Sequence, residues 1–345
     1  MTKNLTRTSV VALLAALTVM SVSAVRGVRL AAGAEGAAEA TQGATGDRAT
    51  FVGTYRLVTI EAKDPASGEW AQRPNFNSIG YITYADTGHM GVHIMARSRQ
   101  PFASNPPTGD EAQAALGGYT AYFGSFTVDD AAQFVVHHRF GQINPGGAVD
   151  AKRFYDFEGD RLTLMPAPSD GGGRDKVTSR LVWERLPNAP LSDAAKQFVG
   201  FHRLLYTDRY REKDGEVVFH GERNYARAGT SYIIYTPTGH MMVHLMQKEG
   251  RTRYAGNRPT PDESLKAFQS YGGYFGRFTT YENYDPPFLM HNQDGTIRPA
   301  RDVDATKRFY EFTGDVLRLG GPPRLNEAGE MAGGHLYWER QPPIE

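Results

Sequence analysis

The stretch that decides the fold runs from Tyr81 to Met95 and reads YITYADTGHMGVHIM. It returns between Tyr232 and Met246 as YIIYTPTGHMMVHLM, with the same residue at ten of fifteen positions. A long internal repeat of this kind indicates two copies of one structural unit. In each copy a Thr-Gly turn separates two runs rich in Tyr, Ile, Val and Met, which is typical of a β-hairpin.

Further landmarks recur around this hairpin in the same order. Phe51-Val52-Gly53 returns as Phe198-Val199-Gly200. The closing Leu181-Val182-Trp183-Glu184-Arg185 returns as Leu336-Tyr337-Trp338-Glu339-Arg340. Because the landmarks keep their order, the repeat covers whole domains rather than one motif.

The start of the chain has a different composition from the rest. The first 24 residues hold two cations, no acid, a short apolar run and small residues up to Ala24, a pattern typical of a secretory signal peptide. An uncleaved anchor is the alternative, although the apolar run is shorter than the ~20 residues of a membrane-spanning helix. We expect an exported protein, periplasmic or secreted, with no transmembrane segment in the mature chain.

The expected organisation therefore has five segments. Residues 25–50 are mostly small and polar and predict a flexible leader. Pro187 and Pro190 interrupt regular structure between the copies. The segments are a signal peptide at 1–24, a leader at 25–50, a first domain at 51–187, a linker at 188–197 and a second domain at 198–345, and we expect each domain to fold independently.

Composition excludes several classes of function. Lys plus Arg and Asp plus Glu both number 38, so no global field favours nucleic acid as a partner. Cysteine is absent, which excludes disulfides, thiolate metal sites and a cysteine nucleophile. The sequence also lacks a Gly-x-Ser-x-Gly elbow, a Walker loop and a dinucleotide fingerprint, so no cofactor is expected.

Short runs rich in Tyr, Phe, Val, Ile and Thr predict the strands of the first copy. One helix interrupts them, with capping boxes that begin at Thr108 in the first copy and at Thr260 in the second. Eight antiparallel strands suit a closed barrel with room for one small ligand, and a β-sandwich is the alternative. The predicted strands are 52–60, 79–84, 89–97, 121–128, 133–140, 152–157, 161–165 and 178–185.

Both copies resemble the bacterial and fungal lipocalin-like domain family. The resemblance lies in Gly53-Thr54-Tyr55-Arg56-Leu57, the Tyr-x-x-x-Gly-His-Met hairpin, Gly159-Asp160-x-Leu162 and the closing Leu-x-Trp-Glu-Arg. It implies an all-β fold of two tandem eight-stranded lipocalin-like antiparallel barrels, each with one short helix. Tyr55 and His202 stand where lipocalins carry the tryptophan of the barrel floor, and Arg185 and Arg340 remain available to stack on a ring.

Successive side chains of a strand point to opposite faces, and this alternation predicts which side chains point inward. In the strand from Lys152, the acids mark one face as solvated, so Arg153 and Tyr155 are expected inside, as are Arg308 and Tyr310. An inward arginine predicts either an anion site or an internal structural pair. The candidate ligand-binding residues are His93, Tyr122, His138, Arg153, Tyr155, Trp183, His244, Tyr274, Arg308, Tyr310 and Trp338.

The histidines of the hairpin do not predict a metal site. On a strand, His89 and His93 lie about 13 Å apart at ~3.3 Å per residue, too far to share one zinc ion. His137 and His138 are adjacent on a strand and point apart. We therefore expect no metal, and His93 and His244 are either pocket residues or structural ones.

These observations favour an exported tandem-barrel protein that binds a small, largely apolar or amphiphilic molecule, rather than an enzyme. One alternative is a cofactor-independent isomerase, cyclase or hydratase, with His138 or His93 as general acid or base and Arg153 steadying negative charge. The other is a structural or interaction module whose barrels are filled solid.

Overall fold

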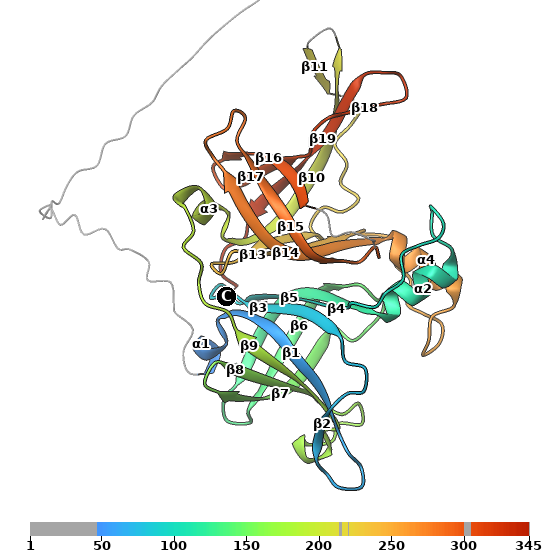
Figure 1. The fold of residues 1–345 in the computed structure, drawn as a ribbon, viewed down its shortest axis with the longest axis vertical. Helices are drawn as coiled ribbons and strands as arrows, with labels where there is room; N and C mark the ends of the chain where they lie inside the picture. Colours follow the sequence, from blue (N-terminus) through green and yellow to red (C-terminus); the bar gives the residue numbers. More distant parts are fainter. Residues whose placement is uncertain (1–46, 214–215, 220, 300–304, 345) are drawn as a thin grey trace, which may run out of the picture. The chain divides into compact units, whose positions relative to one another are not determined.

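Each copy of the repeat folds into a closed antiparallel β-barrel in this computed structural model, which describes residues 47–213, 216–219, 221–299 and 305–344 (Figure 1). The first barrel strand of each copy pairs with the last, which closes the sheet. The expected all-β fold of two eight-stranded barrels is confirmed. The predicted signal peptide and almost all of the leader lie outside the described residues.

Barrel 1 follows the strands expected from the sequence. A short strand, β2 (Trp70–Gln72), extends the end of β1, and a 3-10 turn, η1 (Arg174–Lys176), precedes the last strand. The barrel strands are β1 (Gly53–Lys63), β3 (Ser78–Tyr84), β4 (His89–Ala96), β5 (Tyr119–Asp129), β6 (Phe134–Gln142), β7 (Asp150–Glu158), β8 (Arg161–Pro166) and β9 (Ser179–Arg185).

Barrel 2 repeats this order. Two short strands, β11 (Glu216–Phe219) and β18 (Arg324–Leu325), extend its sheet at the edges. The barrel strands are β10 (Gly200–Lys213), β12 (Tyr232–Tyr235), β13 (His240–Met246), β14 (Tyr271–Tyr281), β15 (Phe288–Thr296), β16 (Ala305–Thr313), β17 (Val316–Gly320) and β19 (Met331–Arg340).

The predicted helices are α2 (Gly109–Gly117) and α4 (Pro261–Gln269), and both begin with the expected capping box. They pack against each other between the barrels, and Gly109 is needed there because a Cβ would lie 2.8 Å from the ring of Pro261. Two further short helices, α1 (Asp47–Phe51) and α3 (Asp193–Phe198), were not predicted. They occupy parts of the stretches expected to be leader and linker.

The helix α1 closes the floor of barrel 1. Phe51 is fully buried and packs edge-on against Tyr84 and Tyr155. Arg185 stacks over the ring of Tyr55, with its guanidinium carbon 4.7 Å from the ring centroid, and donates hydrogen bonds to the carbonyls of Thr50 and Val52. The stacking expected for this arginine is thus present, and it ties the helix to the last strand.

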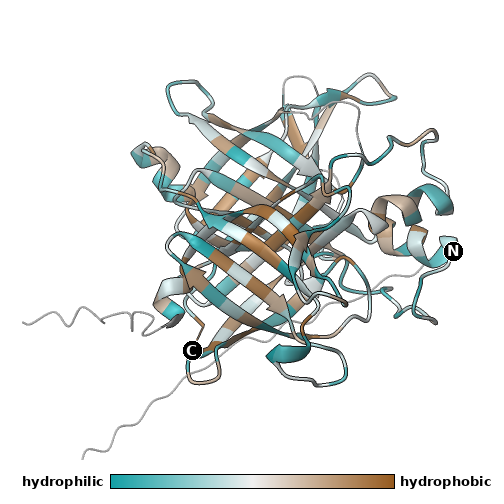
Figure 2. Cartoon of the chain, turned by 60° about the horizontal axis from the view of Figure 1, so that its bottom comes forward, coloured by the Kyte–Doolittle hydropathy of each residue, from teal (hydrophilic) through white to brown (hydrophobic). Residues whose placement is uncertain are grey.

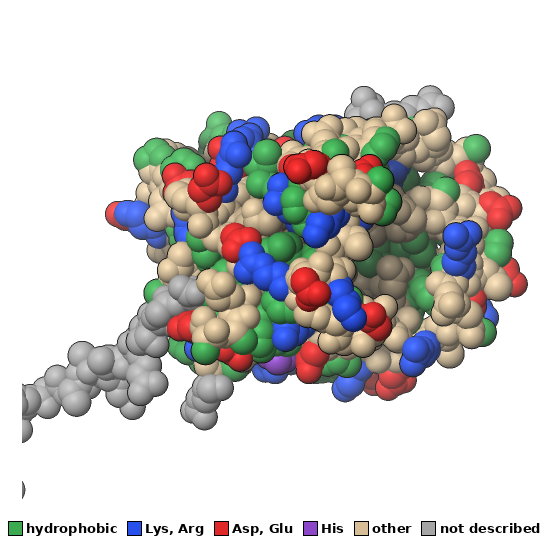
Figure 3. All heavy atoms as spheres, turned by 90° about the horizontal axis from the view of Figure 1, so that it is seen from below, with side chains coloured by type: hydrophobic (Ala, Val, Ile, Leu, Met, Phe, Trp, Pro, Cys, Tyr) green, Lys and Arg blue, Asp and Glu red, His purple; other side chains and the backbone are tan. Residues whose placement is uncertain are grey.

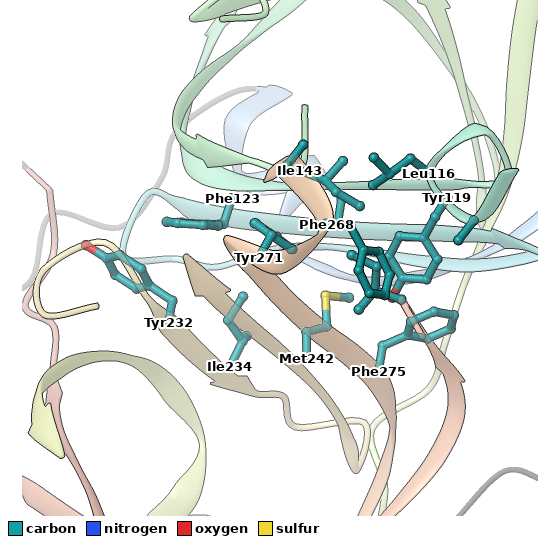
Figure 4. Packing of buried hydrophobic residues seen from close by; sticks show 14 of the residues in the cluster. Leu116, Tyr119, Phe123, Ile143, Tyr232, Ile234, Met242, Phe268, Tyr271 and Phe275 are labelled. Carbon is teal, nitrogen blue, oxygen red and sulfur yellow. The ribbon is translucent and has the colours of Figure 1, made fainter. Parts of the chain in front are cut away.

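The two barrels share a hydrophobic core within one compact unit, Gly43–Glu345. Figure 4 shows side chains from both barrels meeting there, and Figure 2 shows teal and brown residues alternating along the strands around it. At the centre, Phe275 of β14 stacks on His93 of β4, with ring centroids 5.3 Å apart. Burying this face removes apolar surface of both barrels from water, which stabilises the pair.

Two arginines bind across this contact. Arg99 of the barrel 1 side donates to the carbonyls of Thr296 and Ile297 at the end of β15. Arg251 of the barrel 2 side donates to the carbonyls of Gln142 and Ile143 at the end of β6, at 2.7 and 2.8 Å. Each barrel therefore satisfies backbone acceptors of the other.

Candidate functional site

Barrel 1 contains a cavity of about 210 Å³. Its walls are largely apolar, and its polar groups are concentrated on a few side chains. Arg153 of β7, Tyr122 of β5 and Trp183 of β9, all predicted as ligand-binding residues, line it together. The full lining is Ile60, Arg73, Ile82, Val92, Ile94, Thr120, Tyr122, Arg153, Leu164, Pro166, Ser179, Leu181 and Trp183.

A chain of hydrogen bonds leads from the floor of barrel 1 to this cavity. The Tyr84 hydroxyl lies 2.8 Å from Nε2 of His137, and the Tyr122 hydroxyl lies 2.9 Å from Nδ1 of the same ring. His137 is fully buried, and burial together with the nearby charges of Arg153 and Arg139 lowers its pKa well below the usual value. The imidazole is therefore neutral and carries one N–H.

We expected His138 of β6 to point into barrel 1, but the buried histidine of this strand is His137. His138 lies on the outer face, where it contacts Asp150 at 2.8 Å and Thr127 at 2.9 Å. The apolar residue Phe134 lies on the same outer face, where Lys152 packs over its ring. Because the outside of this strand is also apolar, hydrophobicity alone did not mark its inward face.

The expected inward face of β7 is correct. Tyr155 is buried and packs on Phe51, so it belongs to the floor below the cavity, and Phe157 packs on the same ring. Arg153 lies higher and donates to the carbonyl of Lys152 at 2.9 Å. Among the described residues no carboxylate lies within 4.0 Å of its guanidinium.

Trp183 lines the cavity. Its side chain is 1% exposed, and its Nε1–H is buried without a hydrogen-bond acceptor among the described residues. The Nε1–H of Trp338, at the same repeat position in barrel 2, is buried in the same way. The unpartnered indole N–H is therefore a feature of both barrel interiors and not of this cavity.

Barrel 2 repeats the hydrogen-bond chain. Tyr235 and Tyr274 flank His291, with both hydroxyls 2.8 Å from a ring nitrogen. Burial raises the pKa of the Tyr274 hydroxyl, and the nearby charge of Arg308 opposes this effect. Arg308 therefore lies close to Tyr274, as Arg139 lies over the ring of Tyr122 in barrel 1.

The remaining predicted residues of barrel 2 lie in its packed interior. Tyr310 packs edge-on against Phe198, and Trp338 is 1% exposed. A cavity of about 320 Å³ opens in this barrel, but Tyr274, Arg308, Tyr310 and Trp338 do not line it. Its lining residues are Leu204, Thr207, Asn224, Ala226, Arg227, Leu245, Gln247 and Leu336.

His93 and His244 do not lie in the barrel cavities. Their rings stack on each other across the barrel contact, with centroids 4.2 Å apart. Each Nδ1 is hydrogen-bonded to a tyrosine, Tyr119 at 2.9 Å and Tyr271 at 2.7 Å. Both rings are fully buried, so the pocket interpretation of these residues is wrong and the structural one holds.

Another cavity, of about 460 Å³, lies between the barrels rather than inside one. Its hydroxyl groups are already paired, as in the 3.2 Å contact between Thr54 and Thr83. Its arginine, Arg185, is bound to the carbonyls of the floor helix, and Asp86 accepts from the backbone of Thr87. This cavity therefore has fewer free polar groups for a ligand than the cavity of barrel 1.

Sequence reasoning missed the two histidines that organise the barrel interiors, His137 and His291. A usable signal was the pair of tyrosines that recurs in each copy, Tyr84 with Tyr122 and Tyr235 with Tyr274. A buried histidine needs two hydrogen-bond partners, and inward tyrosines on neighbouring strands can supply them.

The described residues contain neither a cluster of metal ligands nor a helix that could span a membrane. Within 47–213, 216–219, 221–299 and 305–344, no three His, Asp or Glu side chains gather as a metal site would require. Over the same residues, no helix has the length and apolar character needed to cross a membrane.

Comparison with known proteins agrees with the barrel geometry. A model of the lipocalin-like domain matches residues 52–186 and again residues 202–341. No curated protein matches the chain. One solved structure, a protein of unknown function from the DUF3598 family of Nostoc punctiforme, is 9% identical, with 86% of this chain and all of that chain covered at a TM-score of 0.21. The chain belongs to the lipocalin-like domain family, of which it carries two tandem copies.

Proposed function

We propose that this protein is exported, that its barrel 1 binds a small molecule with an apolar body and a polar end, and that Arg153 and Tyr122 orient the polar end. The observation that carries the proposal is the placement of Arg153 on an apolar cavity without a carboxylate partner among the described residues. A cation at an apolar wall is stabilised when a ligand atom accepts its hydrogen bonds.

The size of the cavity limits the ligand. Its volume of about 210 Å³ is below the ~300–1,000 Å³ of typical small-molecule pockets. The ligand is therefore short, or its apolar end extends out of the barrel mouth. The apolar side chains of Val92, Leu164 and Leu181 would contact its body.

The binding interpretation is favoured over catalysis by the positions of the histidines. His93 is buried between the barrels, and His138 lies outside barrel 1. His137 is inside, but both of its ring nitrogens are already hydrogen-bonded to tyrosines. None of the three offers a free ring nitrogen to a substrate in the cavity, as a general base requires.

The proposal is tested with the neutral fluorescent probe N-phenyl-1-naphthylamine. The variant Val92→Phe fills the cavity, and Val243→Phe is its matched control at the same repeat position in barrel 2, where the side chain is equally buried. Wild type is expected to bind one probe in barrel 1 with saturation. Val92→Phe should weaken binding at least tenfold and Val243→Phe should not.

Circular dichroism and thermal unfolding of both variants are the check that their folds are intact. Absence of saturable probe binding by the wild-type protein would overturn the proposal. Loss of binding in Val243→Phe but not in Val92→Phe would also overturn it, because the site would then lie in barrel 2.

A further inference from the structure

We infer that the polar end of the ligand is an anion of the carboxylate class, held by the guanidinium of Arg153 and the hydroxyl of Tyr122. This inference rests on the proposed function and specifies which molecules barrel 1 takes.

The charge lining the cavity has one sign. Arg153 and, at the mouth, Arg73 line it, and no Asp or Glu does. Arg139 adds positive charge nearby, with its guanidinium carbon 4.4 Å from the ring centroid of Tyr122. A ligand cation would face three arginines, whereas an anion would form charge-assisted hydrogen bonds.

The surface seen from below does not share this single sign (Figure 3). On the face shown in Figure 3, acidic and basic side chains are interspersed rather than gathered by type. The exposed arginines that do form ion pairs, such as Arg56 with Glu184 and Arg180 with Glu61, lie outside the cavity lining. Selection for an anion would therefore take place in the cavity, at short range.

Which groups donate and which accept in the hydrogen bonds from Tyr84 through His137 to Tyr122 follows from the partners that each group has. The fully buried Tyr84 hydroxyl has His137 as its only hydrogen-bond partner among the described residues. If Tyr84 accepted from His137, its own hydrogen would be buried without an acceptor, which costs about 1–3 kcal/mol. Tyr84 therefore donates to Nε2, and Nδ1–H of His137 donates to the Tyr122 oxygen.

This assignment leaves the O–H of Tyr122 as a donor. Its oxygen already accepts from His137, so its hydrogen is free for another acceptor at the cavity that Tyr122 lines. The guanidinium of Arg153 can only donate. Side chains from β5 and β7 thus offer donors at the cavity, which fits an acceptor-only group such as a carboxylate.

Barrel 2 provides the internal comparison. Arg308, at the repeat position of Arg153, does not line the cavity of about 320 Å³ in that barrel. Arg153 does line the cavity of barrel 1. We therefore place the anion site in barrel 1.

The test compares three eight-carbon probes that share a tail and differ in charge: octanoate, 1-octanol and octylammonium. Each is titrated against the full chain by displacement of N-phenyl-1-naphthylamine at pH 7.5. Octanoate is expected to bind at least tenfold more tightly than 1-octanol, and octylammonium more weakly than both. Tyr122→Phe, which keeps the ring, should reduce the preference for octanoate over 1-octanol about tenfold.

Tyr274→Phe is the matched control and should leave that preference unchanged. If octanoate and 1-octanol displace the probe from wild type equally well, the anion inference is wrong while the proposed function stands. If neither the fluorescent probe nor any of the three compounds binds, both are wrong. The wild-type comparison decides the inference even if a variant fails to fold.

Discussion

Acidification from pH 7 to pH 5 should destabilise this protein through its fully buried histidines. These are His93 and His244 between the barrels, His137 and His291 inside them, and His202 of β10, whose ring hydrogen-bonds the carbonyl of Phe198. Burial lowers the pKa of each, to about 3 for His93 and His291 and to about 4 for His202. In the unfolded chain a histidine titrates near 6.5, so the unfolded state binds protons that the folded state cannot.

The sign and size of the effect follow from linkage. A depressed histidine pKa gives stability that is present above about pH 6.5 and is lost as the pH falls toward the folded-state value. At pH 5 the loss is about 2 kcal/mol for each buried histidine, at 1.36 kcal/mol per pKa unit. Five such residues lose about 10 kcal/mol together, comparable with the ~5–15 kcal/mol of a whole domain.

Carboxylates do not dominate this pH window. The capping carboxylate Glu111, for example, has its pKa lowered to about 2 by hydrogen bonds from Ser104 and Thr108. It therefore keeps its charge throughout the range from pH 7 to pH 5. The histidines are the groups whose proton binding differs between the folded and unfolded states there.

The assay is urea unfolding at pH 7.5, 6.5, 5.5 and 5.0, analysed for the free energy of unfolding. His93→Gln, which keeps a polar partner for Tyr119, should reduce the pH slope by about one proton, or ~1.36 kcal/mol per pH unit. His138→Gln, on the outer surface, is the matched control. A change of less than ~2 kcal/mol between pH 7 and pH 5 would refute the reasoning, as would equal slopes for the two variants.

Three further predictions concern the barrel contact and the start of the chain. Residues 51–187 alone should self-associate or unfold at a lower temperature than the full chain, because Tyr119 and Phe123 lose the side chains of barrel 2 that cover them. Sedimentation and calorimetry measure this. A monomer as stable as the full chain would argue against the shared core. Phe275→Ala should cost about 3–5 kcal/mol in urea unfolding, against under ~1 kcal/mol for Phe140→Ala, whose side chain is 47% exposed. N-terminal sequencing of the exported protein should begin near Val25, and an intact Met1 would contradict cleavage.

Much of the fold could be read from the sequence because its signals are local. The capping boxes at Thr108 and Thr260 specify where the helices begin. Gly88 and Gly159 adopt the positive φ, +83° and +56°, that the hairpin turns require. Alternation along β7 identified Arg153 as inward because exposed acids mark the opposite face of that strand.

The contact between the barrels could not be derived in this way. The strand β4 carries apolar or aromatic groups on both faces, which indicates packing on both sides but not the partner. His93 and His244 looked equivalent to pocket residues because nothing in the local pattern distinguishes burial in a cavity from burial against a second domain. The inward face of β6 was missed for the same reason.

The central claim, that barrel 1 holds an anion beside Trp183, is tested most directly by NMR of the indole N–H groups. The chain contains three tryptophans. The indole signal that disappears in a variant such as Trp183→Phe is thereby assigned to the substituted residue. On saturation with octanoate, the Trp183 resonance should shift because Trp183 lines the cavity, and the Trp338 resonance should stay in place. A shift of Trp338 alone, or no shift of Trp183 at saturation, would contradict the account.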